Sequence, residues 1–273
     1  MDILSLIGFF AGVACVLTAM MIDGGSILAL VQGSAFIIVF GGTIAAVLLQ
    51  SPLPVFLRGL RMLMWVFFPP KDDRAELLTE ILGWLRIIRR QFVLALDPIA
   101  DQQSDPFIRQ GLRMVVDGIE AAHIRTMLET TITAEEHEET LAAEIFEAMG
   151  GYSPTVGILG AVLGLITVMS HLDDPGKLGA GIATAFVATV YGVGFANLIS
   201  LPIANKLKVL VRRRVRRLEM ITEGMVGLAI MEPPMQFEMR LRGYLDGAEP
   251  HEAHPAAGDE TPPGDASEAA AAE

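Results

Sequence analysis

The sequence has little charge and almost no cysteine. Only 19% of its 273 residues are Asp, Glu, Lys or Arg, whereas 52% are hydrophobic; a soluble domain usually carries about 25% charged residues. The apolar residues lie in long uncharged blocks, which indicates a membrane protein rather than one large soluble core. The single cysteine, Cys15, excludes a disulfide framework within the chain and a cysteine-rich zinc site.

The net charge of −12 has the wrong sign for nucleic-acid binding, which needs Lys and Arg to neutralise phosphates. Two-thirds of this imbalance lies in residues 246–273, which contain 8 acidic residues and no Lys or Arg. From Gly247 the sequence is rich in Pro, Ala and Glu and cannot bury enough apolar surface to offset its chain entropy. We therefore predict a disordered acidic tail over 247–273 and no nucleic acid among the partners.

Four charge-free blocks are long enough to cross a bilayer core about 30 Å thick, which needs roughly 20 helical residues. They are Ile3–Ile22, Ile27–Leu49, Ala148–Ser170 and the interval between Lys177 and Lys206. A charged side chain at mid-membrane costs about 2.5–3.5 kcal/mol, so these blocks predict four spans. A cleaved signal peptide is the alternative for the first block, but Met1 and Asp2 provide no basic region before it.

The basic residues set the orientation of the spans. Segment 21–26, between the first two blocks, has no Lys or Arg, and 171–177 has one, whereas Arg58 and Arg61 follow the second block and seven basic residues lie in 206–217. The positive-inside rule then places both termini and segment 51–147 in the cytoplasm. Contact with acidic lipid headgroups is a second role expected of the 206–217 run.

The parts outside the spans read as helical, which makes the fold class all-α. Apolar residues at helical spacing predict a helix over 72–96. Asp105 and Pro106 predict an N-cap and first turn of a helix that runs to about Glu129. Thr133 and Glu136 fit a capping box that opens a helix continuous with the third span.

Five segments follow from these patterns. We expect spans 1 and 2 in 1–50, a cytoplasmic helical domain in 51–147 with an interfacial stretch at 51–70, spans 3 and 4 in 148–205, a cytoplasmic helical extension in 206–246, and the tail. Small residues at four-residue spacing, such as Gly160 and Gly164, predict close helix packing, either within this chain or against another.

No span contains Asp, Glu, Lys or Arg, whereas proton-coupled transporters usually keep ionisable groups at membrane depth. Either the chain moves no protons or a partner's membrane helix supplies the group. His137 stands among four glutamates, but adjacent helical residues point in different directions, so a solvated helix face is favoured over a metal site. With no phosphate-binding loop or nucleophile elbow, we expect no enzyme, metal or cofactor.

Several stretches, in order over residues 1–245, resemble the MotA/PomA flagellar motor stator family of the MotA/TolQ/ExbB superfamily. The stretches are Met1–Asp2 with Ser5–Gly8, Gly24–Ser26, Ile38–Thr43, Phe92–Asp97, Met114–Gly118, Ser153–Gly160, Leu172–Pro175 and Leu201–Leu207. The resemblance implies a stator subunit, active in motility and chemotaxis, in the bacterial inner membrane. It further implies a ring of five such chains around two single-span partners of the MotB/PomB type, which carry the membrane aspartate and grip peptidoglycan.

The resemblance also implies roles for individual residues. By this resemblance, ion flow through the complex is expected to turn the ring and drive the rotor protein FliG. The ion pathway would include Pro154, Ala161, Thr189 and Pro202, and the rotor contact would include Arg89, Arg90 and Asp97. Pro98 stands where the family often has a second acid, which leaves ordinary helix-surface solvation as the alternative for these charges.

Two positions at which this sequence differs from sodium-driven relatives indicate the coupling ion. Sodium-driven relatives tend to carry a threonine where Ala161 stands and an aspartate where Gln32 stands, so we predict proton coupling, with a sodium-driven stator as the alternative. A TolQ/ExbB-type energiser of another envelope process is the second hypothesis, although those proteins usually have three spans. A self-contained channel or transporter is the third, and a membrane enzyme the last.

Overall fold

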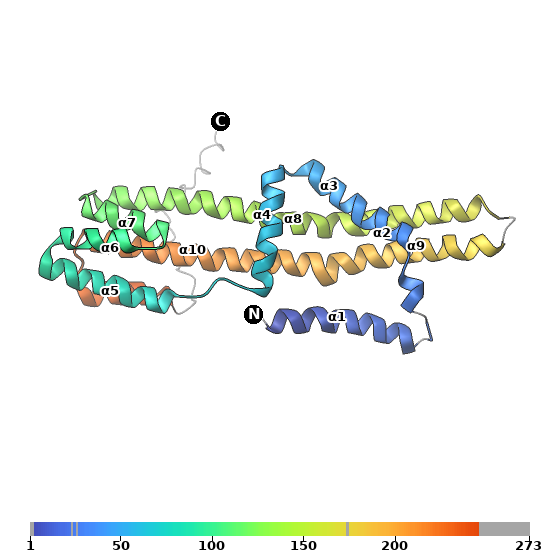
Figure 1. Cartoon of the computed structure of the whole chain (residues 1–273), viewed down its shortest axis with the longest axis horizontal. Helices are drawn as coiled ribbons and strands as arrows, with labels where there is room; N and C mark the ends of the chain where they lie inside the picture. Colours follow the sequence, from blue (N-terminus) through green and yellow to red (C-terminus); the bar gives the residue numbers. More distant parts are fainter. Residues whose placement is uncertain (1–2, 23, 26, 173–174, 246–273) are drawn as a thin grey trace, which may run out of the picture.

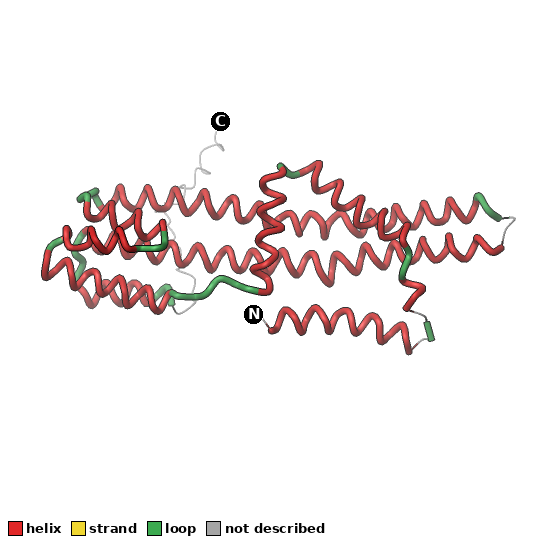
Figure 2. Tube along the Cα trace, viewed as in Figure 1, coloured by secondary structure: helices red, strands yellow, loops and turns green. Residues whose placement is uncertain are grey.

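The computed structural model describes residues 3–22, 24–25, 27–172 and 175–245 of the chain. No strand occurs in these ranges, and short loops join the helices (Figure 2), so the predicted all-α class is confirmed. The predicted acidic tail over 247–273 lies outside the described residues. The helices are α1 (Ile3–Ile22), η1 (Ile27–Leu30), α2 (Gly33–Phe36), η2 (Ile37–Gly41), α3 (Gly42–Gln50), α4 (Leu53–Phe67), α5 (Arg74–Gln91), η3 (Val93–Leu96), α6 (Asp97–Gln102), α7 (Pro106–Val116), α8 (Ala121–Met169), α9 (Pro175–Phe195), η4 (Ala196–Ser200), α10 (Leu201–Ala229) and α11 (Pro234–Arg242).

A long antiparallel helical hairpin forms the axis of the molecule (Figure 1). One arm is α8, whose 49 residues extend about 73 Å at 1.5 Å per residue. The other arm is α9, η4 and α10, which follow one another without leaving helical backbone angles. Each arm is more than twice as long as a bilayer core is thick. The prediction that helices continue beyond the third and fourth blocks is therefore confirmed.

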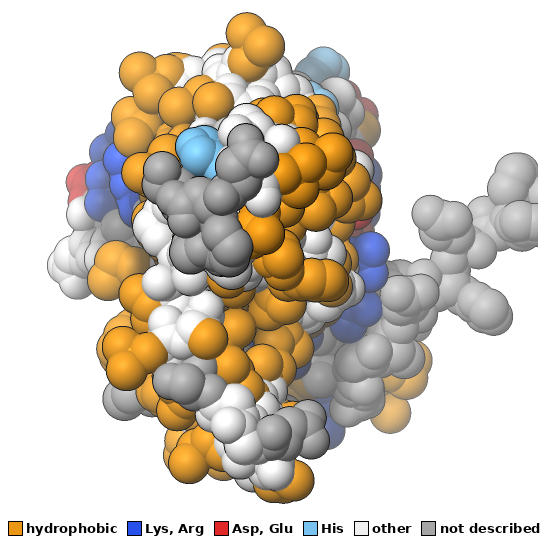
Figure 3. Space-filling view, turned by 90° about the vertical axis from the view of Figure 1, so that its right-hand side faces the viewer, with side chains coloured by type: hydrophobic (Ala, Val, Ile, Leu, Met, Phe, Trp, Pro, Cys, Tyr) orange, Lys and Arg blue, Asp and Glu red, His pale blue; other side chains and the backbone are white. Residues whose placement is uncertain are grey.

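Among the described residues, three helical stretches are long and apolar enough to cross a membrane: Gly33–Gln50, a part of Ala121–Met169 and a part of Leu178–Ala229. Leu6–Ile22, within α1, is a shorter apolar helix. Figure 3 looks onto the end of the hairpin near the turn between α8 and α9, where hydrophobic side chains cover most of the visible surface. Outward-facing residues such as Ile158, Ile166 and Phe186 suit contact with lipid or other helices.

The two arms meet along small residues. A Cβ added to Gly164 would lie 2.8 Å from the backbone nitrogen of Ala185, and one added to Gly157 would lie 2.9 Å from the carbonyl oxygen of Ala188. Side chains larger than hydrogen at these positions would force the backbones apart. The small residues of the third block were expected to pack either within this chain or against another. The contacts observed are within this chain.

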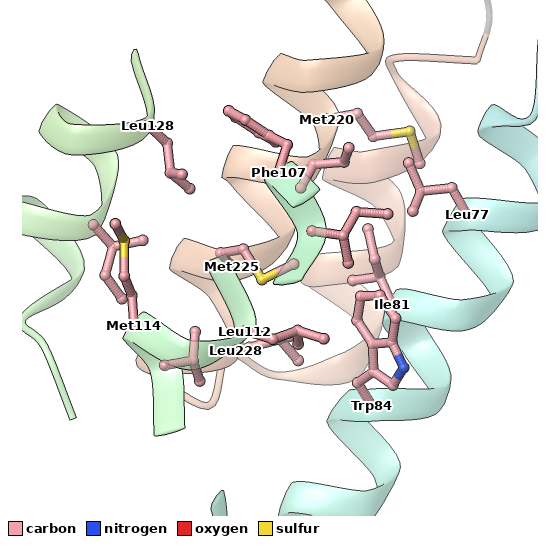
Figure 4. Packing of buried hydrophobic residues seen from close by; sticks show 14 of the residues in the cluster. Leu77, Ile81, Trp84, Phe107, Leu112, Met114, Leu128, Met220, Met225 and Leu228 are labelled. Carbon is pink, nitrogen blue, oxygen red and sulfur yellow. The ribbon is translucent and has the colours of Figure 1, made fainter. Parts of the chain in front are cut away.

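The opposite end of the hairpin carries a packed helical domain. Helices α5, α7 and α11 surround the ends of α8 and α10 that lie far from the α8–α9 turn, and their apolar side chains form one core (Figure 4). The core includes Leu77, Ile81 and Trp84 of α5, which face Met220 and Met225 of α10. The apolar face predicted for 72–96 is thus buried.

Three expected helix boundaries were wrong. The helix from Pro106 ends at Val116 rather than about Glu129, because Gly118 adopts φ 70° and closes a Schellman turn, with Ile119 N donating to Met114 O at 3.1 Å. The capping box does not form, because Thr133 lies inside α8 and its hydroxyl donates to Glu129 O at 2.9 Å. The helix predicted over 72–96 ends at Gln91 and is followed by a 3₁₀ turn.

Helix α4 covers most of the stretch expected at the membrane interface. It crosses the hairpin steeply between its two halves (Figure 1). Gly59 makes this crossing possible, since a Cβ there would lie 2.8 Å from the carbonyl oxygen of Ala142 on α8. Met62 and Val66 are buried against both arms of the hairpin, so α4 joins the apolar half of the molecule to the helical domain.

Candidate functional site

Pro154 interrupts the hydrogen bonding of α8 in the apolar half of the hairpin. Proline has no backbone N–H, so the carbonyl of Gly150 loses its usual helical donor. The neighbouring Ser153 is fully buried, and its hydroxyl donates to the carbonyl oxygen of Gly192 on α9 at 3.1 Å. A Cβ added to Gly192 would lie only 2.4 Å from Ser153 O. The two backbones therefore touch at the proline.

Thr189 lies at the same level of the hairpin, one turn before Gly192. Its Cα is 3.5 Å from the Cβ that Gly157 lacks, so Thr189 packs one turn away from Pro154. The threonine is half-buried, and its hydroxyl approaches Ala185 O at 3.4 Å, near the upper limit for a hydrogen bond. The structure thus brings Pro154 and Thr189 together, although the hydroxyl points back along its own helix.

Pro202 lies apart from this pair. It stands ten residues after Gly192, about 15 Å along the helix, and follows the wide turn of η4. Ser200, in that wide turn, is fully buried and donates to Phe146 O on α8 at 2.7 Å. Ala161 is half-buried on α8, one turn beyond Gly157. The four predicted pathway residues therefore spread along the hairpin rather than forming one cluster.

Sequence reasoning missed the two serines that tie the arms together. Ser153 and Ser200 each donate across the hairpin to a backbone carbonyl and are fully buried. Each also lies within two residues of a proline in an otherwise apolar block. A small hydroxyl residue beside a proline in a membrane block was the available signal.

The predicted rotor-contact residues lie at the other end of the molecule. Arg89 and Arg90 occupy the last turn of α5, where basic side chains complement the helix dipole. Asp97 is the first residue of α6, and all three side chains are exposed. Arg89 donates from Nη2 to the carbonyl oxygen of Glu232 at 3.2 Å. Helices α5 and α6 lie at the end of the hairpin opposite the α8–α9 turn (Figure 1).

An arginine of α10 holds the helical domain to the hairpin. Arg217 donates to the carboxylate of Asp73, just before α5, and from Nη1 to Asp105 Oδ2 at 2.8 Å. Asp105 also caps α7, since its Oδ1 accepts from Phe107 N at 2.9 Å, which confirms the predicted N-cap. The hydrogen bonds from Arg217 are the main cause of the lowered pKa of Asp73.

The basic run over 206–217 is engaged by acidic side chains of α8 as well. Lys208 pairs with Glu147, and Arg214 pairs with both Glu135 and Glu139. Three of the four glutamates around His137 therefore serve as ion-pair partners, Glu135 and Glu139 for α10 and Glu138 for Arg58 of α4. The interpretation of the run as a topology signal overlooked these pairs.

A second ionic network surrounds Glu223 of α10. Its carboxylate accepts from Arg125 of α8 and from Arg240 of α11, and Arg240 also pairs with Glu232. The hydrogen bond to Glu223 is the largest cause of the raised pKa of Arg125. Because Arg89 donates to the carbonyl of Glu232, this network links the hairpin to the exposed end of α5.

Two families match the chain, and together they cover most of it. Residues 99–220 match the MotA/TolQ/ExbB proton channel family, and residues 6–91 match the Motility protein A N-terminal family. Motility protein A of Bacillus subtilis (strain 168) is 34% identical over 247 residues, which is 90% of this chain and 91% of that protein. Chemotaxis protein PomA of Vibrio alginolyticus is 28% identical over 246 residues, covering 90% and 96% of the two chains.

Two solved structures share the fold. A chain of the C. jejuni MotAB structure aligns with a TM-score of 0.85 and 28% identity, over 92% of this chain and 98% of that one. A chain of the flagellar MotAB stator complex from Bacillus subtilis aligns with a TM-score of 0.79 and 33% identity, over 90% and 99%. The likeness therefore includes both the apolar hairpin and the helical domain.

Proposed function

The chain belongs to the motility protein A family, within the wider MotA/TolQ/ExbB family, and from this premise we propose how it works. It is a stator subunit of the bacterial flagellar motor, where the stator complex conducts ions and converts their flow into torque on the rotor. The near full-length similarity to motility proteins carries this conclusion. The same similarity favours a motor subunit over an energiser of the TolQ/ExbB type, a self-contained channel or an enzyme.

We propose four spans in the inner membrane with both termini in the cytoplasm. The fourth span in this count is α1, whose 20 residues carry no charge and match the thickness of a bilayer core. The basic residues after the second and fourth blocks support the orientation, and those not paired with carboxylates would meet lipid headgroups. The division at residues 50, 147, 205 and 246 is part of the same proposal.

The partner would be a single-span chain of the MotB/PomB type, two copies of which stand inside a ring of five copies of this chain. The need for this partner is supported by the sequence, because none of the four apolar blocks carries the carboxylate that proton transfer at membrane depth usually requires. Around Pro154 the chain offers a freed carbonyl and the hydroxyl of Thr189, groups that can accept or relay a hydrogen bond from a partner's carboxylic acid. An ion that crosses 100 mV releases about 2.3 kcal/mol per charge, enough to rearrange a few helix contacts.

Torque would pass from the membrane to the rotor through the hairpin. Helix α8 contains Pro154 and continues into the helical domain, and α10 carries Arg217, which holds the start of α5. Arg89 and Arg90 at the far end of α5, with Asp97, would contact charged residues of the rotor protein FliG. Movement of the arms would then reach the rotor contact without a flexible joint in between.

Protons are the proposed coupling ion. Ala161 provides no hydroxyl, and Gln32, just before α2, provides a neutral amide instead of a carboxylate, so one oxygen ligand and one negative charge suited to Na⁺ are missing. Rotation should continue when external Na⁺ is replaced by K⁺ at constant proton-motive force. If rotation stopped, sodium would be the coupling ion.

The assembly is tested by counting chains in the complex purified gently from native membranes, using native mass spectrometry or particle imaging. Five copies around two single-span chains are expected. A stable lone chain or simple homodimer would contradict the proposal, because the missing carboxylate would then have no source.

A further inference from the structure

The exposed end of the helical domain carries large apolar side chains that no described part of the chain covers. Phe92 is 82% exposed, Leu94 75% and Met235 84%, and Ile230 and Met231 are also more than half exposed. We call these five residues the apolar tip. Scattered exposed apolar residues are ordinary, but a contiguous group marks an interaction site.

Two hydrogen bonds show that these residues share one end of the domain. Helix α11 lies antiparallel to α5, since Arg74 Nη1, at the start of α5, donates to Tyr244 O at 2.6 Å, beyond the end of α11. At the other end, Arg89 donates to the carbonyl of Glu232, just before α11. Phe92 follows α5, and Met231 precedes α11, so both belong to the end joined by Arg89.

The backbone at this end is strained. Phe92 has φ 67° and Met231 has φ 50°, and they are the non-glycine residues with positive φ in the described part of the chain. Each follows the end of a helix, the position where glycine is usual because it has no Cβ penalty. Met231 closes a Schellman turn, with Glu232 N donating to Gly227 O at 3.0 Å.

The fold of this chain gives no reason for the large side chains at these two positions. Glycine would adopt the same turns with less strain, and neither ring nor thioether is buried here. Strained residues of this kind cluster at functional sites. The side chains are therefore better explained by a surface that covers them in the working assembly.

Three exposed arginines lie beside the apolar tip, and the exposed Asp97 follows Leu94 at the same end. Arg86, Arg89 and Arg90 are exposed on the last two turns of α5, and none of them pairs with a carboxylate among the described residues. Such a surface fits a partner that presents acidic side chains next to apolar ones, as an amphipathic acidic helix does.

We propose that the apolar tip is the anchor that seats an acidic amphipathic helix of the rotor, while the arginines steer and align that helix. This inference rests on the proposed function. It adds apolar residues to the charged residues already proposed for the rotor contact. Charge pairs at an exposed rim mainly affect association and are screened by salt, whereas buried apolar anchors set the residence time. The anchor would keep the stator engaged under load.

Photo-crosslinking identifies what covers the anchor. A photoreactive residue is placed at Phe92 or Met235 in cells with working motors, and at Leu141 as the control, which is an exposed apolar residue near the middle of α8. We expect adducts with the rotor protein from positions 92 and 235 and none from position 141. Adducts between two copies of this chain would instead assign the apolar tip to an interface within the ring and overturn the proposal.

Glycine variants separate a functional role from a structural one. Phe92→Gly and Met231→Gly remove the exposed side chain and relieve the positive φ, so both should raise the apparent Tm of the purified complex. The same variants should shorten the residence of stator units at the motor about tenfold, which corresponds to 1.4 kcal/mol. A lower Tm with unchanged residence would mean that the residues serve the fold and would overturn the anchor.

Arg90→Glu, measured in the same assay, distinguishes the anchor from the proposed function. If Arg90→Glu lowers torque while the glycine variants keep normal residence, the anchor is wrong and the rotor contact stands. If neither Arg90→Glu nor the glycine variants affect torque or residence, both the proposed rotor contact at this end of α5 and the proposed anchor are wrong.

Discussion

Arg217 of α10 holds Asp73 in a bidentate ion pair, with Nε and Nη2 donating to the two carboxylate oxygens at 2.6 and 2.9 Å. Asp73 stands immediately before α5, the helix whose far end carries Arg89 and Arg90. The third hydrogen bond of Arg217 goes to Asp105, the N-cap of α7. One guanidinium on α10 thus fixes the starts of two helices in the domain for which we propose the rotor contact.

Replacing this arginine should loosen the domain. Arg217→Ala removes charge-assisted hydrogen bonds to two half-buried carboxylates, so we expect a loss of about 1–3 kcal/mol in unfolding free energy. Arg212→Ala is the matched control, since Arg212 is exposed on the same helix and should change stability by no more than about 0.5 kcal/mol. Thermal unfolding of the purified complex measures both, and equal effects would contradict the role given to Arg217.

The pH dependence of that loss follows from Asp73. The hydrogen bonds from Arg217 lower the pKa of Asp73 below its ordinary 3.8, so the pair contributes its full stability above 3.8 and loses it as pH falls through the lower folded-state pKa. The Tm difference between the parent protein and Arg217→Ala should therefore be the same at about pH 5 and about pH 7. A difference that faded between these two values would rule out Asp73 as the partner.

The charge of Glu219 should lower stability at neutral pH, which is the opposite of the effect of Asp73. Burial, and then the nearby Glu136, raise the pKa of Glu219 above its ordinary 4.5. A raised carboxyl pKa favours the folded state when the group is protonated and disfavours it as pH rises through the folded-state value. Glu219→Gln should therefore increase Tm at neutral pH, and the gain should vanish below pH 4.5. A variant that is less stable at neutral pH would show that the charge of Glu219 is needed.

The contact between the two arms should tolerate no side chain at Gly192. A Cβ there would lie 2.4 Å from Ser153 O, so Gly192→Ala should separate α8 from α9 beside Pro154, lower stability by about 1–3 kcal/mol and reduce rotation. Gly194→Ala is the control two residues away, where an added Cβ meets nothing within 4 Å. Comparable swimming and stability in the two variants would contradict the close contact.

Pro154→Ala tests the break that the proline makes in the hydrogen bonding of α8. Alanine restores an N–H for the carbonyl of Gly150 and so occupies the group proposed to meet the partner's carboxylic acid, so we expect intact assembly and impaired rotation. Tethered-cell speed and complex yield are the two measurements. Normal speed would mean that the proline does not shape the ion pathway.

Much of the fold could be predicted from local patterns. The apolar face of α5, the cap at Asp105 and the small-residue contact all follow from spacing and capping chemistry. The end of α7 could also have been predicted, because the dipeptide Asp117–Gly118 is typical of a turn that ends a helix.

Other features depend on residues distant in sequence or on unusual backbone angles. Arg217 lies 144 residues from Asp73 and 112 from Asp105, so no local pattern reveals their pairing. Phe92 and Met231 end helices without the glycine that normally signals such a turn. At both positions a large side chain stands where the backbone favours glycine, and such exceptions are expected at functional positions.

We expect this chain, together with a single-span partner, to generate torque in the flagellar motor. The most direct measurement is the rotation speed of a bead on a flagellar stub, in cells that lack their own stator and express both chains. The speed should rise in discrete steps as complexes join the motor, and this chain without the partner should give no rotation. Absence of steps although both chains are in the membrane, or full rotation from this chain alone, would contradict this expectation.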